Sequence, residues 1–383
     1  MRRCSGSLLA VIFFSLVWST FRANAQLDHI TIAAGTDEDK ALQAITAEQD
    51  AQKKLAMYQD FVQKFSSNPS AVAYGNWQIA QAYQATGDFQ KALDYGDKAL
   101  VASPRNLDIL VMQASLAQQA KNNSKLIDYA ANGGELCHSI GKGPKPDGVS
   151  DEDFARQVGE DKDASKSSCE FLETSGFNAI QTETDPHSRL DYIEKFSAAF
   201  PESKFKDQVS SYAMETLGPG QLNDMPRLIA YCEKTLAANP NSLVALLELA
   251  SFYSEDAKPG SAAKAVGYAQ KAIAVANPDA PDADATRKLS AGVAHSTLGY
   301  AYMKQEKTAA AIPELKSAAI LLKGHNDVQY AIVLYRLGFA YAKLIRNTEA
   351  RDVLMEAVKI PGPVQSMSQD LLNKVNAARA KGK

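Results

Sequence analysis

The sequence predicts an all-α protein, an α-α superhelix of stacked helix pairs with a helical non-repeat insert and a C-terminal capping helix. Two observations carry this prediction. Small and aromatic residues recur at fixed places in segments of about 34 residues, and a longer pattern repeats at an offset of 136 residues. Hydrophobic residues make up 45% and charged residues 22% of the 383 residues, so the chain can bury a core.

The longer pattern joins residues 98–104 (KALVASP) to residues 234–240 (KTLAANP). Four more positions agree at the same offset: Leu107, Leu110, Ala114 and Ser115 match Leu243, Leu246, Ala250 and Ser251. Residues 60–65 (DFVQKF) and 191–196 (DYIEKF) form a second similar pair, and each is followed within five residues by a proline. An ancestral unit has therefore been duplicated.

The residue types of the shorter pattern follow from the packing of two helices. A Gly or Ala where two helices cross lets their backbones approach, and a Tyr one turn later fills the space beside it. A proline or polar cluster after the second helix turns the chain into the next pair. The four clearest series are Ala80, Tyr83, Gly87, Phe89, Ala92, Ala99 and Pro104; Leu249, Ala250, Tyr253, Ala265 and Ala272; Leu298, Gly299, Tyr302, Ala311 and Ala318; and Leu337, Gly338, Tyr341, Ala350 and Ala357.

These series resemble the tetratricopeptide repeat (TPR) over roughly 73–140 and 205–364. The resemblance implies antiparallel helix pairs whose stacking creates a concave side, and binding of proteins or peptides there. The segment 145–154 (KPDGVSDEDF) is also similar to one in exported TPR proteins of soil bacteria, a group with no established activity to carry over.

The expected organisation has six parts. These are a signal peptide (1–25), N-terminal helices (26–72), a first TPR-like block (73–140), a linker and helical insert (141–182), a second TPR-like block (183–364) and a capping helix (365–383). Ser150 is a suitable N-cap for a helix over 151–182, whose first turn is acidic. Whether the blocks form one superhelix or two is left open.

The first 25 residues have the features of an export signal. Arg2 and Arg3 precede an apolar stretch at 8–17, and Ala23-Asn24-Ala25 provides a cleavage site before Gln26. The apolar stretch covers about half of the ~20 residues that span a bilayer. We therefore expect a periplasmic or extracellular protein without stable membrane insertion.

The charge balance argues against nucleic-acid binding. The first 25 residues hold three of the 41 bases and none of the 44 acids, so the mature chain carries 38 bases against 44 acids. A nucleic-acid binder needs a basic face to displace counterions.

No sequence pattern predicts catalysis, a cofactor or a metal. HExxH, GxSxG, CxxC and phosphate-loop patterns are absent, and no two of the five histidines are spaced i, i+4. The mature chain has three cysteines, Cys137, Cys169 and Cys232. A Cys137–Cys169 disulfide across the linker is one interpretation, and three buried apolar thiols is the one that we favour.

The TPR resemblance selects a candidate groove, because the first helix of each repeat lines the concave side. By register the lining residues are Tyr74, Trp77 and Gln81; Tyr300, Met303 and Lys304; and Tyr335, Phe339 and Lys343. Aromatic residues beside lysines suit an extended, partly apolar peptide with negative charge. The alternative is that these aromatics pack against neighbouring helices. The Lys and Asn clamp of chaperone-tail-binding members is absent, so that ligand class is not implied.

The sequence thus predicts a non-catalytic exported scaffold or adaptor that binds a protein or peptide in the cell envelope. One alternative is a self-assembling structural envelope protein, with an end of the stack pairing to a second copy. The other is an envelope enzyme that uses the 137–182 region, where Cys137, His138 and Cys169 are the only plausible reactive groups.

Overall fold

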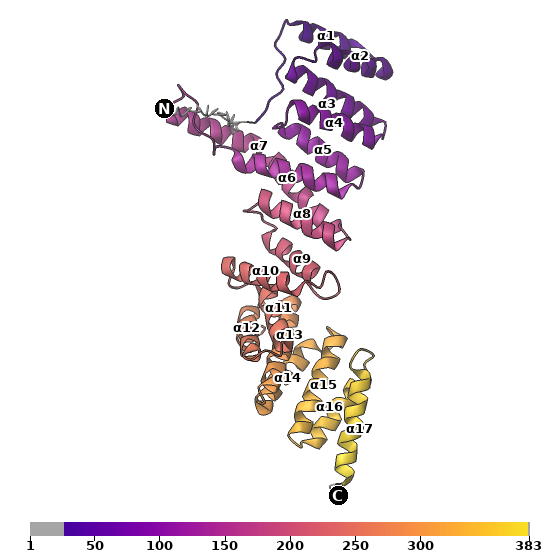
Figure 1. The fold of residues 1–383 in the computed structure, drawn as a ribbon, viewed down its shortest axis with the longest axis vertical. Coiled ribbons are helices and arrows are strands. Elements are labelled where there is room, and N and C mark those ends of the chain that lie inside the picture. The colour runs from indigo at the N-terminus through magenta and orange to yellow at the C-terminus, as the bar shows by residue number, and fades with distance from the viewer. Residues whose placement is uncertain (1–26, 382–383) are drawn as a thin grey trace, which may run out of the picture. The chain divides into compact units, whose positions relative to one another are not determined.

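The computed structural model describes residues 27–381, so the expected signal peptide and its cleavage site lie outside the described residues. Within that range every regular element is an α-helix, which confirms the all-α prediction (Figure 1). The chain divides into two compact units, with the boundary between Ser175 and Gly176. Among residues 27–381, no helix combines the length and apolar character needed to cross a membrane.

The first unit consists of antiparallel helix pairs followed by one long helix. Its helices are α1 (Asp37–Ala47), α2 (Ala51–Lys64), α3 (Pro69–Ala85), α4 (Phe89–Ala102), α5 (Leu107–Gln119), α6 (Asn123–Ser139) and α7 (Asp151–Thr182), which crosses the boundary between the units. Side-chain caps begin several of them. The side chains of Asp88, Asn106 and Asn122 accept backbone N–H groups at the starts of α4, α5 and α6.

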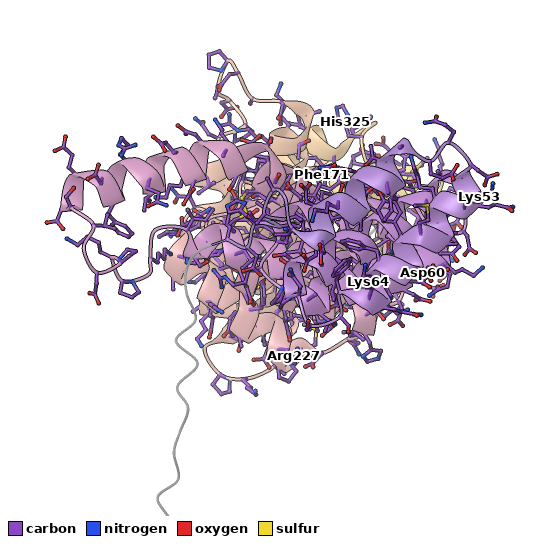
Figure 2. All side chains as sticks on the ribbon, turned by 90° about the horizontal axis from the view of Figure 1, so that it is seen from above. Lys53, Asp60, Lys64, Phe171, Arg227 and His325 are labelled. Carbon is purple, nitrogen blue, oxygen red and sulfur yellow. A yellow bond between two sulfur atoms is a disulfide. The ribbon has the colours of Figure 1, made fainter. Side chains whose placement is uncertain are left out.

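Helix α2 has one face in the core and one face in solvent. Tyr58 and Phe61 are buried against the neighbouring helices, whereas Lys53, Asp60 and Lys64 lie on the outer face (Figure 2). Residues seven and four apart share one side of an α-helix, so the sequence of α2 already separates a core face from a solvent face.

Helix α7 occupies the range that the sequence predicts for the insert. The hydroxyl of Ser150 accepts the Asp153 N–H at 3.0 Å, as expected of its N-cap. Most residues in the first half of α7 are exposed. A disulfide between Cys137 of α6 and Cys169 joins the two helices, so the favoured interpretation of three buried thiols is wrong for these two cysteines. It is confirmed for Cys232 alone, which is a buried free thiol.

The N-terminal segment returns to the turn between α4 and α5. The Arg105 N–H donates to the Asp28 carboxylate at 2.8 Å, and the Asn106 amide donates to the Asp28 carbonyl at 3.2 Å. These bonds hold an extended segment, which has no helical hydrogen bonds of its own, against the first unit.

The second unit continues the helix pairs and ends with the expected capping helix. Its helices are α8 (Pro186–Ala199), α9 (Lys206–Leu217), α10 (Met225–Ala238), α11 (Leu243–Glu255), α12 (Ser261–Ala276), α13 (Ala285–Lys304), α14 (Thr308–Leu322), α15 (Asp327–Lys343), α16 (Asn347–Ala357) and α17 (Gln365–Lys381). Leu372 and Val375 of α17 are buried against the last helix pair.

The recurring glycines sit where helices cross closely. A Cβ atom on Gly338 would lie 2.6 Å from Leu354 Cγ, and one on Gly299 would lie 2.7 Å from Leu315 Cγ. Such distances are too short for two carbon atoms, so only glycine allows these approaches. The close crossings confirm the packing that the repeat pattern predicts.

Candidate partner-binding surface

The first helices of three successive pairs, α11, α13 and α15, carry a connected polar and aromatic cluster in the second unit. We call it the first-helix surface, and it consists of Glu255, Ser296, Tyr300, Lys304, Arg336, Phe339 and Lys343. On α13, positions 296, 300 and 304 lie on one side, and on α15 positions 336, 339 and 343 do the same.

Arg336 is the centre of this surface. Its Nη1 donates to the Ser296 hydroxyl at 3.1 Å, and its guanidinium carbon lies 4.3 Å from the centre of the Tyr300 ring. Its Nη2 is 3.7 Å from a Glu255 carboxylate oxygen, and the Tyr300 hydroxyl donates to the other Glu255 oxygen at 3.3 Å. One arginine thus ties three first helices together.

The positive charge of Arg336 is only partly balanced. Its side chain is 21% exposed, whereas that of Glu255 is 62% exposed and largely hydrated. Burial lowers the pKa of the Arg336 guanidinium, and the nearby Glu255 and Tyr300 oppose that shift. Arginine nevertheless keeps its charge at neutral pH. A half-buried cation with one distant, hydrated carboxylate can be stabilised further by a second anion.

The surroundings add positive charge and an open aromatic ring. Lys304 Nζ lies 5.6 Å from the centre of the Tyr300 ring, and Lys343 is exposed. Within the described residues, Lys343 makes no ion pair or hydrogen bond. Phe339, one turn from Arg336, is 42% exposed. The surface therefore offers an apolar contact next to unbalanced cations.

Two of the predicted groove residues of this unit are used in packing. Met303 and Tyr335 are half-buried and pack against the core that includes Leu337, Tyr341 and Leu354. By contrast, Phe339 and Lys343 are exposed, and Tyr300 contacts Lys304 and Arg336 within the cluster.

The predicted groove residues of the first unit have different surroundings. Tyr74 packs against the cluster that contains Phe61, and the Trp77 indole N–H points to the sulfur of Met112 at 3.0 Å. Gln81 is exposed and makes no hydrogen bond within the described residues. Two of these three side chains thus fill space between helices. Their role in binding stays a prediction.

Sequence reasoning missed Arg336, Glu255 and Ser296. The register of the family places its groove residues at fixed positions of each first helix, and Arg336 falls beside one of them, after Tyr335. A signal was present, because position 336 is three residues before Phe339 and seven before Lys343 on the same side of α15. The contacts to Glu255 and Ser296 depend on tertiary packing alone.

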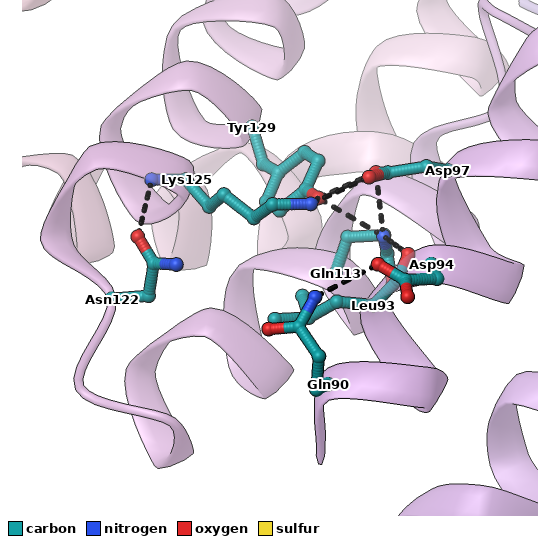
Figure 3. A network of polar contacts seen from close by, with 8 residues as sticks. All are labelled: Gln90, Leu93, Asp94, Asp97, Gln113, Asn122, Lys125 and Tyr129. Carbon is teal, nitrogen blue, oxygen red and sulfur yellow. Dashed lines mark hydrogen bonds and ion pairs between the residues drawn. The ribbon is translucent and has the colours of Figure 1, made fainter.

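A second polar cluster joins α4, α5 and α6 in the first unit (Figure 3). The Gln113 amide, fully buried, donates to the Leu93 carbonyl and to an Asp97 oxygen, both at 2.9 Å. The other Asp97 oxygen pairs with Lys125 at 2.6 Å, and the Tyr129 hydroxyl donates to Asp97 at 2.5 Å. Burial and the Asp97 carboxylate raise the pKa of Tyr129, so its hydroxyl stays protonated. The cluster joins α4, α5 and α6 through one buried amide and one ion pair.

The alternative of an envelope enzyme depended on reactive cysteines, and the structure leaves none of the three as a reactive thiol. Cys137 and Cys169 are consumed in the disulfide, and burial raises the pKa of Cys232 to about 12, which keeps that thiol protonated. Among the described residues, no group of His, Cys, Asp and Glu side chains could hold a metal ion.

No family model matches the chain, and no curated protein matches it in sequence. Solved structures with similar helical arrays do match. The TPR domain of P58(IPK) has 12% identity and a TM-score of 0.35, with 91% of this chain and 99% of that chain covered. A TPR protein from Parabacteroides merdae has 12% identity, a TM-score of 0.29 and coverage of 88% and 98%. The APC/C hetero-tetramer Cut9-Hcn1 has 13% identity, a TM-score of 0.30 and coverage of 93% and 94%. Because these scores are below 0.5, the class of this protein, an array of TPR-like helix pairs, rests on its own glycine crossings and repeated positions.

Proposed function

We propose that this chain is an exported, non-catalytic scaffold that binds a segment of a partner protein on the first-helix surface. The observation that carries the proposal is the half-buried, incompletely balanced Arg336 beside the exposed ring of Phe339. A partner segment with an acidic side chain next to an apolar one would satisfy both. Because stacked helices fix the surface before binding, little entropy is lost in ordering it.

Export is part of the proposal. The signal-like residues 1–25 support it, and so does the Cys137–Cys169 disulfide, since disulfides persist mainly in oxidising compartments. Expression of the full chain in a Gram-negative host, followed by N-terminal sequencing, checks this part. We expect Gln26 as the first residue of the exported protein. An intact Met1 in the cytosol would contradict export.

The binding test is affinity capture from envelope extract of the source cells with residues 26–383. Wild type is compared with Phe339→Ser and Arg336→Met, and with Ile320→Ser as the matched control. Ile320 is also an exposed apolar residue of this unit, at 78%, but it lies on a second helix, α14. We expect a protein that wild type and Ile320→Ser retain and that both surface variants lose. Equal retention by all four proteins would exclude this surface.

A further inference from the structure

A cavity of about 470 Å³ opens between α8, α9 and α10 in the second unit, and none of the first-helix surface residues lines it. Small-molecule sites in proteins have volumes of about 300–1,000 Å³. No sequence pattern indicates this cavity, and the proposed docking of a partner segment does not use it.

The walls of the cavity are mostly apolar. Among its lining residues, Phe196 and Val209 are buried, and Phe200 and Tyr231 are half-buried. Burial raises the pKa of Tyr231, and its hydroxyl is hydrogen-bonded to Ser210, another residue of the lining. Such a lining favours the hydrocarbon or aromatic part of a ligand.

The rim of the cavity carries an excess of positive charge. Lys206 and Lys234 are exposed, and within residues 27–381 neither side chain makes an ion pair or hydrogen bond. Of the two acids at the rim, Glu194 forms an ion pair with Arg227 (Figure 2), with 3.0 Å between the charged atoms. Asp207 is exposed and has no ion pair among the described residues, so the two lysines leave one positive charge in excess. A ligand with one negative charge fits this rim.

Comparison with the corresponding helices of the first unit suggests a reason for the cavity between α8, α9 and α10. Residues 60–65 of α2 correspond to residues 191–196 of α8. In the first unit, α2 approaches α3 at Gly75, where an added Cβ would lie 2.4 Å from Val62. Helix α9, which follows α8, contains no glycine between Lys206 and Leu217. Without such a close crossing, α8 cannot approach its neighbour in the same way.

The offset of 136 residues also relates the cavity side chains to packed ones. Tyr231 corresponds to Tyr95, which stacks on Tyr83 with ring centres 5.5 Å apart. Lys234 corresponds to Lys98, whose Nζ lies 4.0 Å from the centre of the Tyr95 ring. Among the described residues, Tyr231 stacks on no ring and Lys234 covers none. The same two residue types thus fill space in the first unit and line open space in the second.

We propose that this cavity binds a small apolar molecule with one carboxylate, such as a medium-chain fatty acid. The hydrocarbon part lies against Phe196, Phe200 and Tyr231, and the carboxylate lies at the rim beside Lys206 and Lys234. The occupant is a small molecule because all residues that line the cavity lie within or beside three helices, and none belongs to the first-helix surface.

The test is isothermal titration calorimetry of residues 26–383 with decanoate, and with 1-decanol as the uncharged ligand of the same chain length. Lys206→Gln/Lys234→Gln removes the rim charges. Lys91→Gln/Lys98→Gln in the first unit removes the same charge away from the cavity and serves as the matched control. We expect one decanoate per chain, affinity about tenfold weaker for the rim variant, and no change for the control. The rim variant should leave decanol binding unchanged.

A cavity-filling variant, Thr235→Phe, tests the location of the site. With helicity and melting temperature close to wild type, it should lose both ligands. Three results would overturn the proposal: no heat of binding for decanoate with wild type, equal affinity for decanoate and decanol, or equal weakening by the rim and control variants. If Thr235→Phe fails to fold, the rim and control pair still decides the outcome.

Discussion

The first helices of the two units carry aromatic residues at equivalent register positions but use them differently. In the first unit, Tyr74 and Trp77 pack between helices, and Trp77 contacts Met112. In the second unit, the Tyr300 ring stacks on the half-buried Arg336, and Phe339 remains 42% exposed. The repeat register therefore identifies which positions of each first helix lie on the same side of that helix. The neighbouring helices decide whether a residue there fills space or stays available to a partner.

The largest effect should come from the covalent bond that only the first unit has. Cys137→Ser/Cys169→Ser removes a disulfide that closes a segment of 32 residues, and we expect the free energy of unfolding of this unit to fall by about 2–4 kcal/mol. Trp77 is the only tryptophan within residues 26–383, so in a protein of these residues its fluorescence during urea unfolding reports on this unit. An unchanged fluorescence midpoint under non-reducing conditions would contradict the bridge.

The next largest effect concerns the close helix crossings of the second unit. Gly338→Ala places a Cβ against Leu354, and we expect a loss of about 1–3 kcal/mol. Gly267→Ala in α12 is the matched control, because no atom lies within 4 Å of an added Cβ there. That variant should gain about 0.4–1 kcal/mol. Circular dichroism should detect both changes, while the Trp77 fluorescence transition stays in place. Equal effects of the two variants would refute the crossing.

Substitution of Trp77 and of Phe339 tests directly whether the first unit uses its aromatic residue for packing and the second unit leaves its own exposed. Trp77→Ser removes a packed ring, and we expect it to lower the free energy of unfolding by at least about 1 kcal/mol. Phe339→Ser removes an exposed ring and should change it by less than about 0.5 kcal/mol. Thermal unfolding followed by circular dichroism measures both. A larger loss for Phe339→Ser would mean that Phe339 is a packing residue.

The smallest effect is a pH dependence in the second unit. Burial raises the pKa of Glu248, so between its ordinary and its raised pKa the folded protein binds more protons than the unfolded chain. The free energy of unfolding therefore falls as pH rises through this window. Glu248→Gln should stabilise the protein at pH 7, and the gain should vanish below the ordinary carboxyl pKa. Urea unfolding at pH 4 and pH 7 tests the sign, and a gain that grows toward pH 4 would contradict it.

Helix positions were predictable because their signals are local. Ser150 and the three acids after it fix the start of α7, and the small residues at Gly299 and Gly338 fix where pairs cross. The disulfide was not predictable in this way. It depends on α6 and α7 lying side by side at Cys137 and Cys169, which no local pattern specifies.

The candidate surface was predictable in part for the same reason. The register selected Tyr300 of α13 and Phe339 of α15, because each lies at a groove position of its first helix. It missed Arg336, whose importance comes from its contacts with two other helices. The cavity beside Tyr231 could not be predicted from the sequence, because its lining comes from three helices and depends on how closely they pack.

The most direct test of the central claim is site-specific photo-crosslinking in envelope extract. A benzoylphenylalanine replaces Phe339, and the same residue replaces Trp77 or Ile320 in two control proteins. We predict that position 339 crosslinks one partner, that adding Arg336→Met abolishes this crosslink, and that positions 77 and 320 give none. Crosslinking of the same protein from all three positions, or a crosslink at 339 that Arg336→Met leaves intact, would contradict the assignment of the first-helix surface.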